Sequence, residues 1–225
     1  MEQKKLVGDK AAMFVEDQMT VGLGTGSTAE YMVKAVAKRV EEEGLNITCV
    51  ATSIVTEKLA KDLGLNVKDL AEVAEIDLTI DGADEISPAY QGIKGGGGAL
   101  LFEKIVAINS KKNIWIADTT KLVDTLGAFP LPVEVVSFGS EHLFAAFEAK
   151  GYQPAYRLDT DGNKFETDAG NLIIDLHLEK IEEPKKLAQE LKNEVGVVEH
   201  GLFINIVDQA IVGHDDGEIE IFHAK

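Results

Sequence analysis

Hydrophobic and polar positions alternate along the first half of the chain with two different periods. Longer segments with apolar residues at helical spacing predict helices, and short apolar runs between them predict strands. Strands that alternate with helices across glycine-rich turns indicate βαβ units and a mostly parallel sheet. The predicted elements are helices over 2–15, 27–42, 54–63 and 99–110 and strands over 20–23, 47–50, 76–80 and 113–117.

The segment Phe129-Pro130-Leu131-Pro132 predicts a boundary, because two prolines in three positions are not expected to continue a helix or an inner strand. Beyond it the order of elements becomes β-α-β-β-α-β, which is typical of a small ferredoxin-like lobe. Its predicted strands lie at 133–138, near Tyr156, at 171–176 and near Val197, and its helices at 141–150 and 184–191. Two last strands, within 204–212 and 218–222, are expected to return to the first sheet.

These patterns predict an α/β protein. A Rossmann-like, mostly parallel sheet with helices on both faces is expected to occupy residues 1–128 and 204–225. A smaller ferredoxin-like α+β lobe is expected to occupy residues 129–203. No internal repeat interrupts this order.

The composition limits the partners of such a fold. Of the 225 residues, 45% are hydrophobic and 27% charged, which suits a globular protein with a sizeable core. The net charge of −17 argues against nucleic acid, whose phosphates need a basic surface. An anionic ligand would have to be captured locally, by placed lysines and backbone amides.

Cys49 is the single cysteine, so disulfides and multi-cysteine metal sites are excluded, and its apolar neighbours predict a core position. The start of the chain lacks the apolar stretch of a secretory signal, and no segment has the apolar length of a membrane span. A cytoplasmic protein with no membrane partner is expected.

A glycine cluster, Gly22–Thr28, follows a predicted strand and opens a helix. Exposed amides and a helix N-terminus suit a phosphate group. Ser27 stands where the dinucleotide fingerprint needs its third glycine, and no Gly-Lys-Ser/Thr follows for a P-loop. The cluster is either a simple strand-to-helix turn or a site for a small phosphorylated ligand.

Three carboxylates fall within Asp81-Gly82-Ala83-Asp84-Glu85, directly after the predicted strand at 76–80. Ligands of open α/β sheets bind outside the carboxyl ends of the strands, where Asp81 would lie. A solvated acidic turn, a magnesium site and an acid/base site all fit this segment.

Lys94 is followed by four successive glycines, Gly95–Gly98. Such a run is costly to order, so a stable fold keeps it where side chains cannot fit, and a backbone packed around a ligand is the natural reason. A flexible linker is disfavoured because an apolar helix begins at once. Lys94 would supply a point charge.

Glu103 lies in that helix among apolar neighbours at helical spacing. A desolvated carboxylate favours its protonated form, which raises its pKa and makes it a base suited to carbon acids near neutral pH. A salt bridge to a nearby lysine is the structural alternative. Lys121 follows another predicted strand and is either a solvated lysine or part of the same edge. The five histidines show no metal-ligand spacing.

Four segments together carry a resemblance to a known family. They are GLGTGSTA at 22–29, DGADE at 81–85, KGGGGALLFEK at 94–104 and IADTTKLVDTLGAFPLPVEV at 116–135. In this order and at this spacing the chain resembles ribose-5-phosphate isomerase of type A over effectively its full length. That family is expected to have a Rossmann-like domain with a smaller α/β domain, to use no metal or cofactor, and to form homodimers or larger assemblies.

The resemblance implies a phosphosugar substrate and a role for each matched position. Glu103 would be the general base, and Asp81, Asp84 and Lys94 would handle the substrate oxygens. Lys4 resembles the family's N-terminal phosphate-contacting lysine, although Lys5 beside it leaves the register open. The implied binding residues are Thr25, Gly26, Ser27, Thr28, Asp81, Gly82, Ala83, Asp84, Lys94, Gly95, Gly96, Gly97, Lys121 and Lys4.

Three other functions fit parts of the pattern. A non-catalytic sensor of sugar phosphates would bind the ligand without proton exchange. A magnesium-dependent phosphatase would use Asp81, Asp84 and Glu85 and would lose activity in a chelator. A CoA transferase of related fold would need a glutamate nucleophile and a longer chain.

Overall fold

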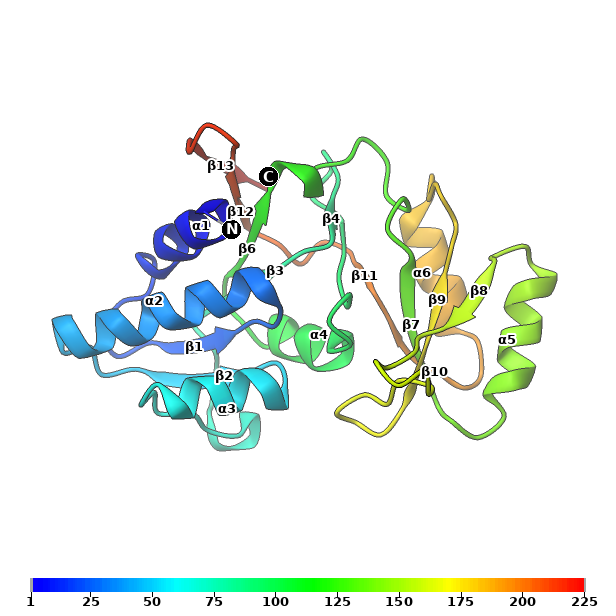
Figure 1. Cartoon of the computed structure of the whole chain (residues 1–225), viewed down its shortest axis with the longest axis horizontal. Coiled ribbons are helices and arrows are strands. Elements are labelled where there is room, and N and C mark those ends of the chain that lie inside the picture. The colour runs from blue at the N-terminus through cyan, green and yellow to red at the C-terminus, as the bar shows by residue number, and fades with distance from the viewer. Residues whose placement is uncertain (1, 225) are drawn as a thin grey trace. The chain divides into compact units, whose positions relative to one another are not determined.

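The computed structural model describes residues 2–224, which form two compact units. The large unit contains residues up to Ala83, Phe102–Leu122 and Asn205 onward, and the small unit contains Asp84–Leu101 and Val123–Ile204. Figure 1 shows the elements of both units.

A six-stranded sheet forms the centre of the large unit, in the order β13-β12-β6-β3-β1-β2. All neighbouring strands run parallel except β12 and β13, which are antiparallel. The mostly parallel sheet and the return of the last two strands to it are therefore confirmed. The strands are β1 (Thr20–Leu23), β2 (Thr48–Ala51), β3 (Leu78–Gly82), β6 (Asn113–Asp118), β12 (Gln209–Gly213) and β13 (Ile219–His223).

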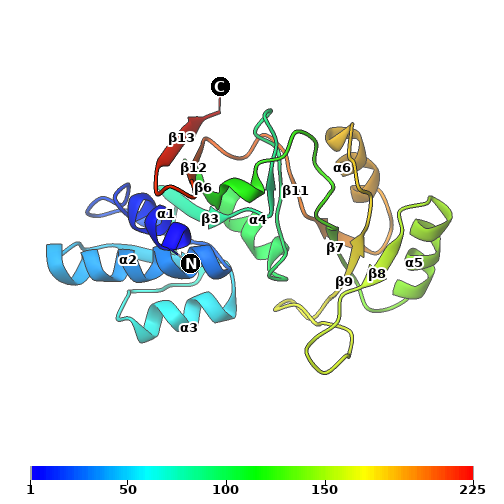
Figure 2. The same cartoon turned by 45° about the horizontal axis from the view of Figure 1, so that its top comes forward.

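Helices cover this sheet because its strands present apolar residues on both faces. Val21, Leu23 and Ile80 share a core with α1 (Glu2–Ala12) and α2 (Ser27–Glu43), which lie side by side in Figures 1 and 2. Val50 and Ile76 form a second core with α4 (Leu100–Ile108). The remaining helical elements of this unit are α3 (Ile54–Asp62), η1 (Leu70–Glu72) and η2 (Thr119–Lys121).

Cys49 belongs to the first of these cores, as predicted, and is fully buried. Burial raises the pKa of its thiol to about 12, because the thiolate would lie in apolar surroundings. The thiol therefore stays protonated at neutral pH, and Cys49 behaves as a small core residue.

The first helix is shorter than predicted and ends at Ala12 instead of residue 15. The chain then turns, with the Val15 N–H donating to the Ala12 carbonyl at 3.1 Å. Arg39 of α2 fixes this turn, because its Nη1 donates to the carbonyl of Ala12 at 2.5 Å and to that of Val15 at 2.8 Å. The other guanidinium nitrogens bind the carboxylate of Glu43 at 2.7 and 2.8 Å.

The small unit holds a four-stranded antiparallel sheet in the order β10-β7-β9-β8. Leu143 and Phe147 of α5 and Leu191 of α6 belong to one core with apolar residues of this sheet, so both helices cover the same face. This is the predicted ferredoxin-like order β-α-β-β-α-β. Its elements are β7 (Leu131–Val135), α5 (Ser140–Ala149), β8 (Pro154–Tyr156), β9 (Leu172–Leu176), α6 (Pro184–Lys192) and β10 (Val197–His200).

The expectation that Pro132 could not belong to an inner strand is wrong. Pro132 lies within β7, which has β10 on one side and β9 on the other. Pairing with β10 ends at His200 opposite Val133, so no ladder bond needs the missing proline N–H. The Pro132 carbonyl still accepts from the Gly201 N–H at 2.8 Å.

A three-stranded sheet completes the small unit, with β5 (Gly92–Ile93) between β4 (Glu85–Ile86) and β11 (Leu202–Phe203). The sequence placed 84–101 with the first domain because of its position between predicted βαβ elements. In the structure β5 pairs with β11, which follows the ferredoxin-like lobe in the chain, so this segment joins the small unit.

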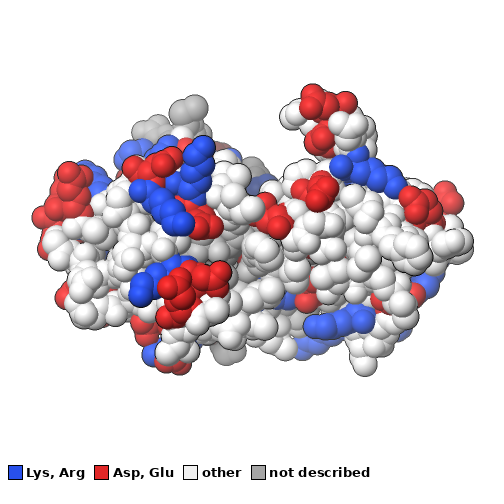
Figure 3. Space-filling view, turned by 90° about the horizontal axis from the view of Figure 1, so that it is seen from below, with Lys and Arg blue, Asp and Glu red and all other residues white. Residues whose placement is uncertain are grey.

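Charged side chains of both signs are interspersed on the face drawn in Figure 3, without a broad basic field. The lack of a broad basic field on this face agrees with the net charge of −17. Within residues 2–224, none of the helices combines the length and the apolar character that crossing a membrane would require.

Glu134 of β7 is a buried acid in the small unit. Its Oε1 accepts from the Thr167 hydroxyl at 2.8 Å and from the Asn171 amide at 3.0 Å. Burial raises the pKa of Glu134, and the negative charges of Glu199 and Asp168 raise it further against these two hydrogen bonds. Folding is therefore penalised when this carboxyl is ionised.

We predict that Glu134→Gln reduces the pH dependence of stability. A raised folded-state pKa stabilises the protein below the unfolded value of about 4.3 and loses that contribution as pH rises through the folded value. The melting temperatures at pH 5 and pH 8 should differ less in the variant than in the wild-type protein. Glu141→Gln is the control expected to leave this difference unchanged, because Lys164 lowers the pKa of Glu141, which therefore stays ionised at both pH values in the folded and the unfolded protein. A pH dependence unchanged in Glu134→Gln would contradict this prediction.

Candidate functional site

The loop between β1 and α2 packs against the end of β3. The Gly24 N–H donates to the Ile80 carbonyl at 2.9 Å. A Cβ on Gly24 would lie 2.5 Å from the Cα of Asp81 and still closer to its carboxylate. Only glycine fits here, so the first glycine cluster is required for this close approach.

Asp81 fixes the same loop with its carboxylate. Its side chain is buried, and Oδ1 accepts from the Thr25 N–H at 3.0 Å and from the Gly82 N–H at 2.7 Å. Because side chains alternate along a strand, Asp81 and Thr79 lie on the same face of β3. A carboxylate with two amide donors has a fixed orientation at the carboxyl edge of the sheet.

The Thr25 side chain joins a cluster of hydroxyl groups at the start of α3. Its Oγ1 lies 2.7 Å from that of Thr52, 2.8 Å from the Ser53 hydroxyl and 3.2 Å from that of Thr56. Sequence reasoning missed these three residues. The signal was present, because Thr52, Ser53 and Thr56 follow a predicted strand as the Thr25 loop does.

Lys4 belongs to α1, and its side chain reaches the N-terminus of α2. Its Nζ contacts the Ser27 hydroxyl at 2.8 Å, whereas Lys5 is exposed and pairs with Asp9. Of the two lysines, Lys4 therefore belongs with the glycine cluster. Gly26, at φ +103°, precedes the helix without a capping side chain, so the first amides of α2, the Ser27 hydroxyl and Lys4 form a group of donors suited to an anion.

Glu103 lies in the first turn of α4 and is 4% exposed, so its predicted burial is confirmed. A Cβ on Gly22 of β1 would lie 2.9 Å from Cγ1 of Val106 and 2.9 Å from Cβ of Thr79. The face of the sheet that carries Thr79 and Asp81 is thus the face that α4 covers. Glu103 precedes Val106 by one turn, which places it on the sheet-facing side of α4 at its N-terminal end.

Lys121 lies in η2, directly after β6. The Asp118 carboxylate caps this turn by accepting from the Thr120 N–H at 3.0 Å. Parallel strands end at one edge, so the loops after β1, β3 and β6 share it. In the large unit this edge carries Thr25–Thr28, Asp81–Ala83 and Lys121.

The small unit carries the other predicted residues. Lys94 is 2% exposed, its N–H donates to the Gly201 carbonyl at 2.9 Å, and its Nζ lies 5.3 Å from the centre of the Phe203 ring. This cation–π contact helps to stabilise the ammonium group in its buried position. Nothing in the sequence pattern pointed to Phe203.

Three of the four glycines after Lys94 have no room for a side chain. A Cβ would lie 2.8 Å from Leu100 at Gly95, 2.6 Å from the Asp84 carboxylate at Gly96 and 2.6 Å from the Phe165 ring at Gly98. The Gly96 N–H donates to Asp84 Oδ2 at 2.7 Å. The glycine run is therefore a packed loop and not a linker.

Glu85 has a structural role. It is buried, and its two carboxylate oxygens accept from the N–H of Gly127 at 2.7 Å and of Phe129 at 2.6 Å. The third acid of the segment 81–85 thus anchors a loop of the small unit. Within the described residues, no group of three His, Cys, Asp or Glu side chains could hold a metal ion.

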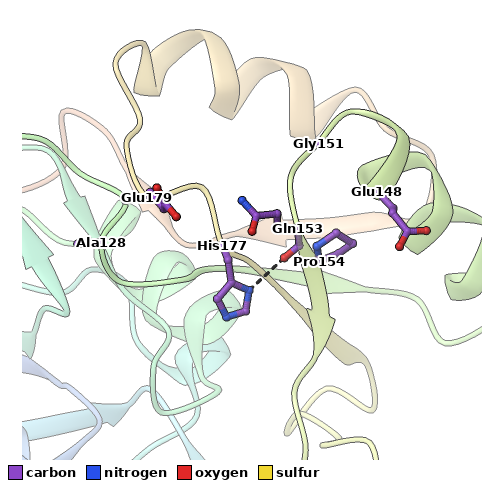
Figure 4. Close-up of a pocket in the computed structure, with 8 residues that line it drawn as sticks. Ala128, Glu148, Gly151, Gln153, Pro154, His177 and Glu179 are labelled. Carbon is purple, nitrogen blue, oxygen red and sulfur yellow. Dashed lines mark hydrogen bonds between the residues drawn. The ribbon is translucent and has the colours of Figure 1, made fainter.

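A separate hollow of about 580 Å³ lies in the small unit (Figure 4). Glu148, Gln153, His177 and Glu179 are among its lining residues, and none of the predicted site residues is. His177 Nδ1 lies 3.1 Å from the Gln153 carbonyl, so its ring orients a turn of the backbone.

The fold and the position of these loops define the chain as an α/β protein of the kind that binds small ligands at the carboxyl edge of a parallel sheet. Comparison with known proteins identifies it further. The chain belongs to the ribose 5-phosphate isomerase A (phosphoriboisomerase A) family, whose model matches residues 48–217. It is therefore an aldose–ketose isomerase, an enzyme of the pentose phosphate pathway.

Several relatives are similar over nearly the full length. The chain is 61% identical over 217 residues to ribose-5-phosphate isomerase A of Enterococcus faecalis and 58% over 220 residues to that of Lacticaseibacillus paracasei, with 96% of each chain covered. A solved D-ribose-5-phosphate isomerase in complex with phospho-erythronic acid superposes with a TM-score of 0.95, at 34% identity, covering 99% of this chain and 98% of that one. The solved ribose 5-phosphate isomerase A of Methanocaldococcus jannaschii superposes with a TM-score of 0.93 at 35% identity, with 98% of each chain covered.

We predict that Gly24→Ala lowers turnover of ribose 5-phosphate by about 10²-fold, because the new Cβ displaces the Asp81 carboxylate. Gly44→Ala is the matched control. Its Cβ meets nothing within 4 Å, but its φ of +71° makes alanine cost about 1–2 kcal/mol of stability. Steady-state kinetics and thermal unfolding of both variants separate the two effects. Normal turnover by folded Gly24→Ala would show that the close approach is not needed.

Proposed function

We propose that the enzyme interconverts D-ribose 5-phosphate and D-ribulose 5-phosphate through a cis-enediolate, with Glu103 as the general base. The observation that carries the proposal is the buried carboxylate of Glu103 in the first turn of α4, on the side that faces the sheet. Its neighbours along the helix, Leu100, Val106 and Ala107, are also buried. A carboxylate kept from water is well suited to remove a proton from carbon.

The reaction moves one proton between two carbons. Glu103 removes the proton from C2 of the open-chain aldose, and the resulting enediolate receives a proton at C1 from the same carboxyl group. Asp81 relays a proton between O1 and O2. Its orientation by the Thr25 and Gly82 amides supports this role, because a relay must present its oxygen in one direction.

The phosphate group of the substrate is assigned to the N-terminus of α2. Lys4, Ser27, Thr28 and the Gly26 loop supply charge, hydroxyls and amides there, and Lys121 follows a neighbouring strand at the same edge. The ligand of the similar solved isomerase supports this class of substrate. Phospho-erythronic acid carries a phosphate, and its carboxylate shares the planar, negatively charged character of an enediolate.

Lys94, Asp84 and the loop Gly95–Gly97 are assigned to the substrate oxygens. Lys94 supplies the positive charge that an enediolate needs, and a developing oxyanion gains most from donors placed in advance. Asp84 accepts the Gly96 N–H at 2.7 Å, which fixes the backbone of that loop.

The alternatives account for fewer observations. A magnesium-dependent phosphatase would require Glu85 as a ligand, yet both of its carboxylate oxygens accept backbone N–H groups. A sensor without catalysis would need no base, so the buried carboxylate of Glu103 counts against it. The chemistry needs no cofactor, and we expect full activity in excess chelator.

We further propose that the enzyme is a homodimer, as the resemblance implies, and that it works in the cytoplasm. Its phosphorylated substrate is retained there, because a doubly charged phosphate crosses a lipid bilayer at great cost. Light scattering of the pure protein should give twice the mass of one chain, and the mass of a single chain would contradict the dimer.

We predict that Glu103→Gln lowers kcat for ribose 5-phosphate by about 10²–10⁴-fold with a modest change in KM, because the amide cannot accept the proton. Reactions are followed by ketose formation, and deuterium from D₂O should enter the product of the wild-type enzyme. Glu141→Gln, in the exposed first turn of α5, is the control expected to keep wild-type kinetics. A folded Glu103→Gln protein with near-normal kcat would end the assignment of the base.

A further inference from the structure

The glycine loop of the small unit is held from one side by a single arginine. Arg157 Nη1 donates to the carbonyl of Gly95 at 2.6 Å and to that of Gly96 at 3.1 Å. The other two guanidinium nitrogens donate to the carboxylate of Asp175 in β9, Nε to Oδ2 at 3.0 Å and Nη2 to Oδ1 at 2.5 Å. All four groups belong to the small unit.

This arrangement is rigid because each partner is itself fixed. The side chains of Arg157 and Asp175 are only 15% and 17% exposed, so the pair is largely screened from water. The Arg157 N–H donates to the Ile173 carbonyl at 2.9 Å, and its own carbonyl accepts from the Phe165 N–H at 2.8 Å. Phe165 in turn covers Gly98, at the other end of the glycine loop.

The two carbonyl contacts determine where the loop's amides point. No peptide bond among the described residues is cis, and in a trans peptide the C=O and N–H point in opposite directions. With the carbonyls of Gly95 and Gly96 turned to Arg157, the N–H groups of Gly96 and Gly97 point away from it. The Gly96 N–H donates to Asp84, so the Gly97 N–H is directed to the side of the loop on which Asp84 lies.

We propose that Arg157 is a positioning residue for the isomerisation. By binding two successive carbonyls, it aims the Gly97 N–H at the substrate oxygen that becomes negative in the enediolate. This inference rests on the proposed function and adds the side chain that orients the Gly97 amide within the loop already assigned to the substrate oxygens. Lysine could not replace arginine here, because a single ammonium cannot fork onto Asp175 and also reach two carbonyls.

The chain contains its own matched control. Its only other arginine is Arg39, which forks onto Glu43 and donates from Nη1 to the carbonyls of Ala12 and Val15 in the large unit. Each arginine thus makes four hydrogen bonds of the same kinds, two to a carboxylate and two to backbone carbonyls. Arg39 binds the turn after α1, whereas Arg157 binds the glycine loop.

The test compares Arg157→Lys with Arg39→Lys in the full-length enzyme, after wild-type isomerisation of ribose 5-phosphate has been established. Arg157→Lys is expected to lower kcat by up to about 10²-fold with KM within about threefold, because the donor acts on the transition state. Arg39→Lys should keep wild-type kcat despite a similar loss of melting temperature. Millimolar guanidinium should restore turnover in Arg157→Ala and not in Glu103→Gln.

A second measurement does not depend on any variant. In the wild-type enzyme, the Gly97 amide resonance should shift and its hydrogen exchange should slow when phospho-erythronic acid binds. An unperturbed Gly97 amide in the complex, or wild-type kcat in folded Arg157→Lys, would overturn the inference while leaving the isomerase intact. A wild-type enzyme inactive on ribose 5-phosphate would instead overturn the proposed function.

Discussion

The close approach of Gly24 to Asp81 is the constraint on which the candidate site of the large unit depends. Without a side chain at Gly24, the last buried residue of β3 reaches the loop after β1, and its carboxylate accepts the Thr25 N–H. Thr25 then connects this loop to Thr52, Ser53 and Thr56 at the start of α3. The Asp81 carboxylate and the Thr25 hydroxyl thus connect the ends of the neighbouring strands β3, β1 and β2. These contacts also fix the N-terminus of α2, where the proposed function places the phosphate group.

The three acids of the segment 81–85 show how like charges coexist in a short stretch of chain. Asp81 accepts amides of the loop after β1 and of its own turn, Asp84 accepts Gly96, and Glu85 accepts Gly127 and Phe129. Each carboxylate is compensated by backbone N–H groups of a different loop, so no cation has to be shared among them. Two of these acids are assigned to substrate chemistry and the third holds a loop in place.

Arginine and lysine have separate roles in this chain. The two arginines each fork onto a carboxylate and hold two backbone carbonyls, which a planar guanidinium does well. The lysines assigned to the substrate, Lys4, Lys94 and Lys121, would act as point charges under the proposed function. An acidic protein would then capture an anion with a few placed cations and amides and without a basic surface.

The sequence by itself determined the order of the longer helices and strands, the mostly parallel sheet, the ferredoxin-like lobe and the burial of Glu103, because all of these follow from local periodicity and turn chemistry. It did not reveal the short strands β4, β5 and β11. It also located the glycine loops, since runs such as Gly95–Gly98 have few structural uses. Four segments at matched spacing were enough to indicate the family.

Only the tertiary structure decided which groups meet. The pairing of β5 with β11, the place of Pro132 in an inner strand, the choice of Lys4 over Lys5 and the structural use of Glu85 all depend on partners distant in the chain. The same holds for Arg157, which reaches Gly95 across more than sixty residues. The local sequence pattern indicates which kinds of contact a residue is able to make. Its actual contacts are set by packing between elements that lie far apart in the sequence.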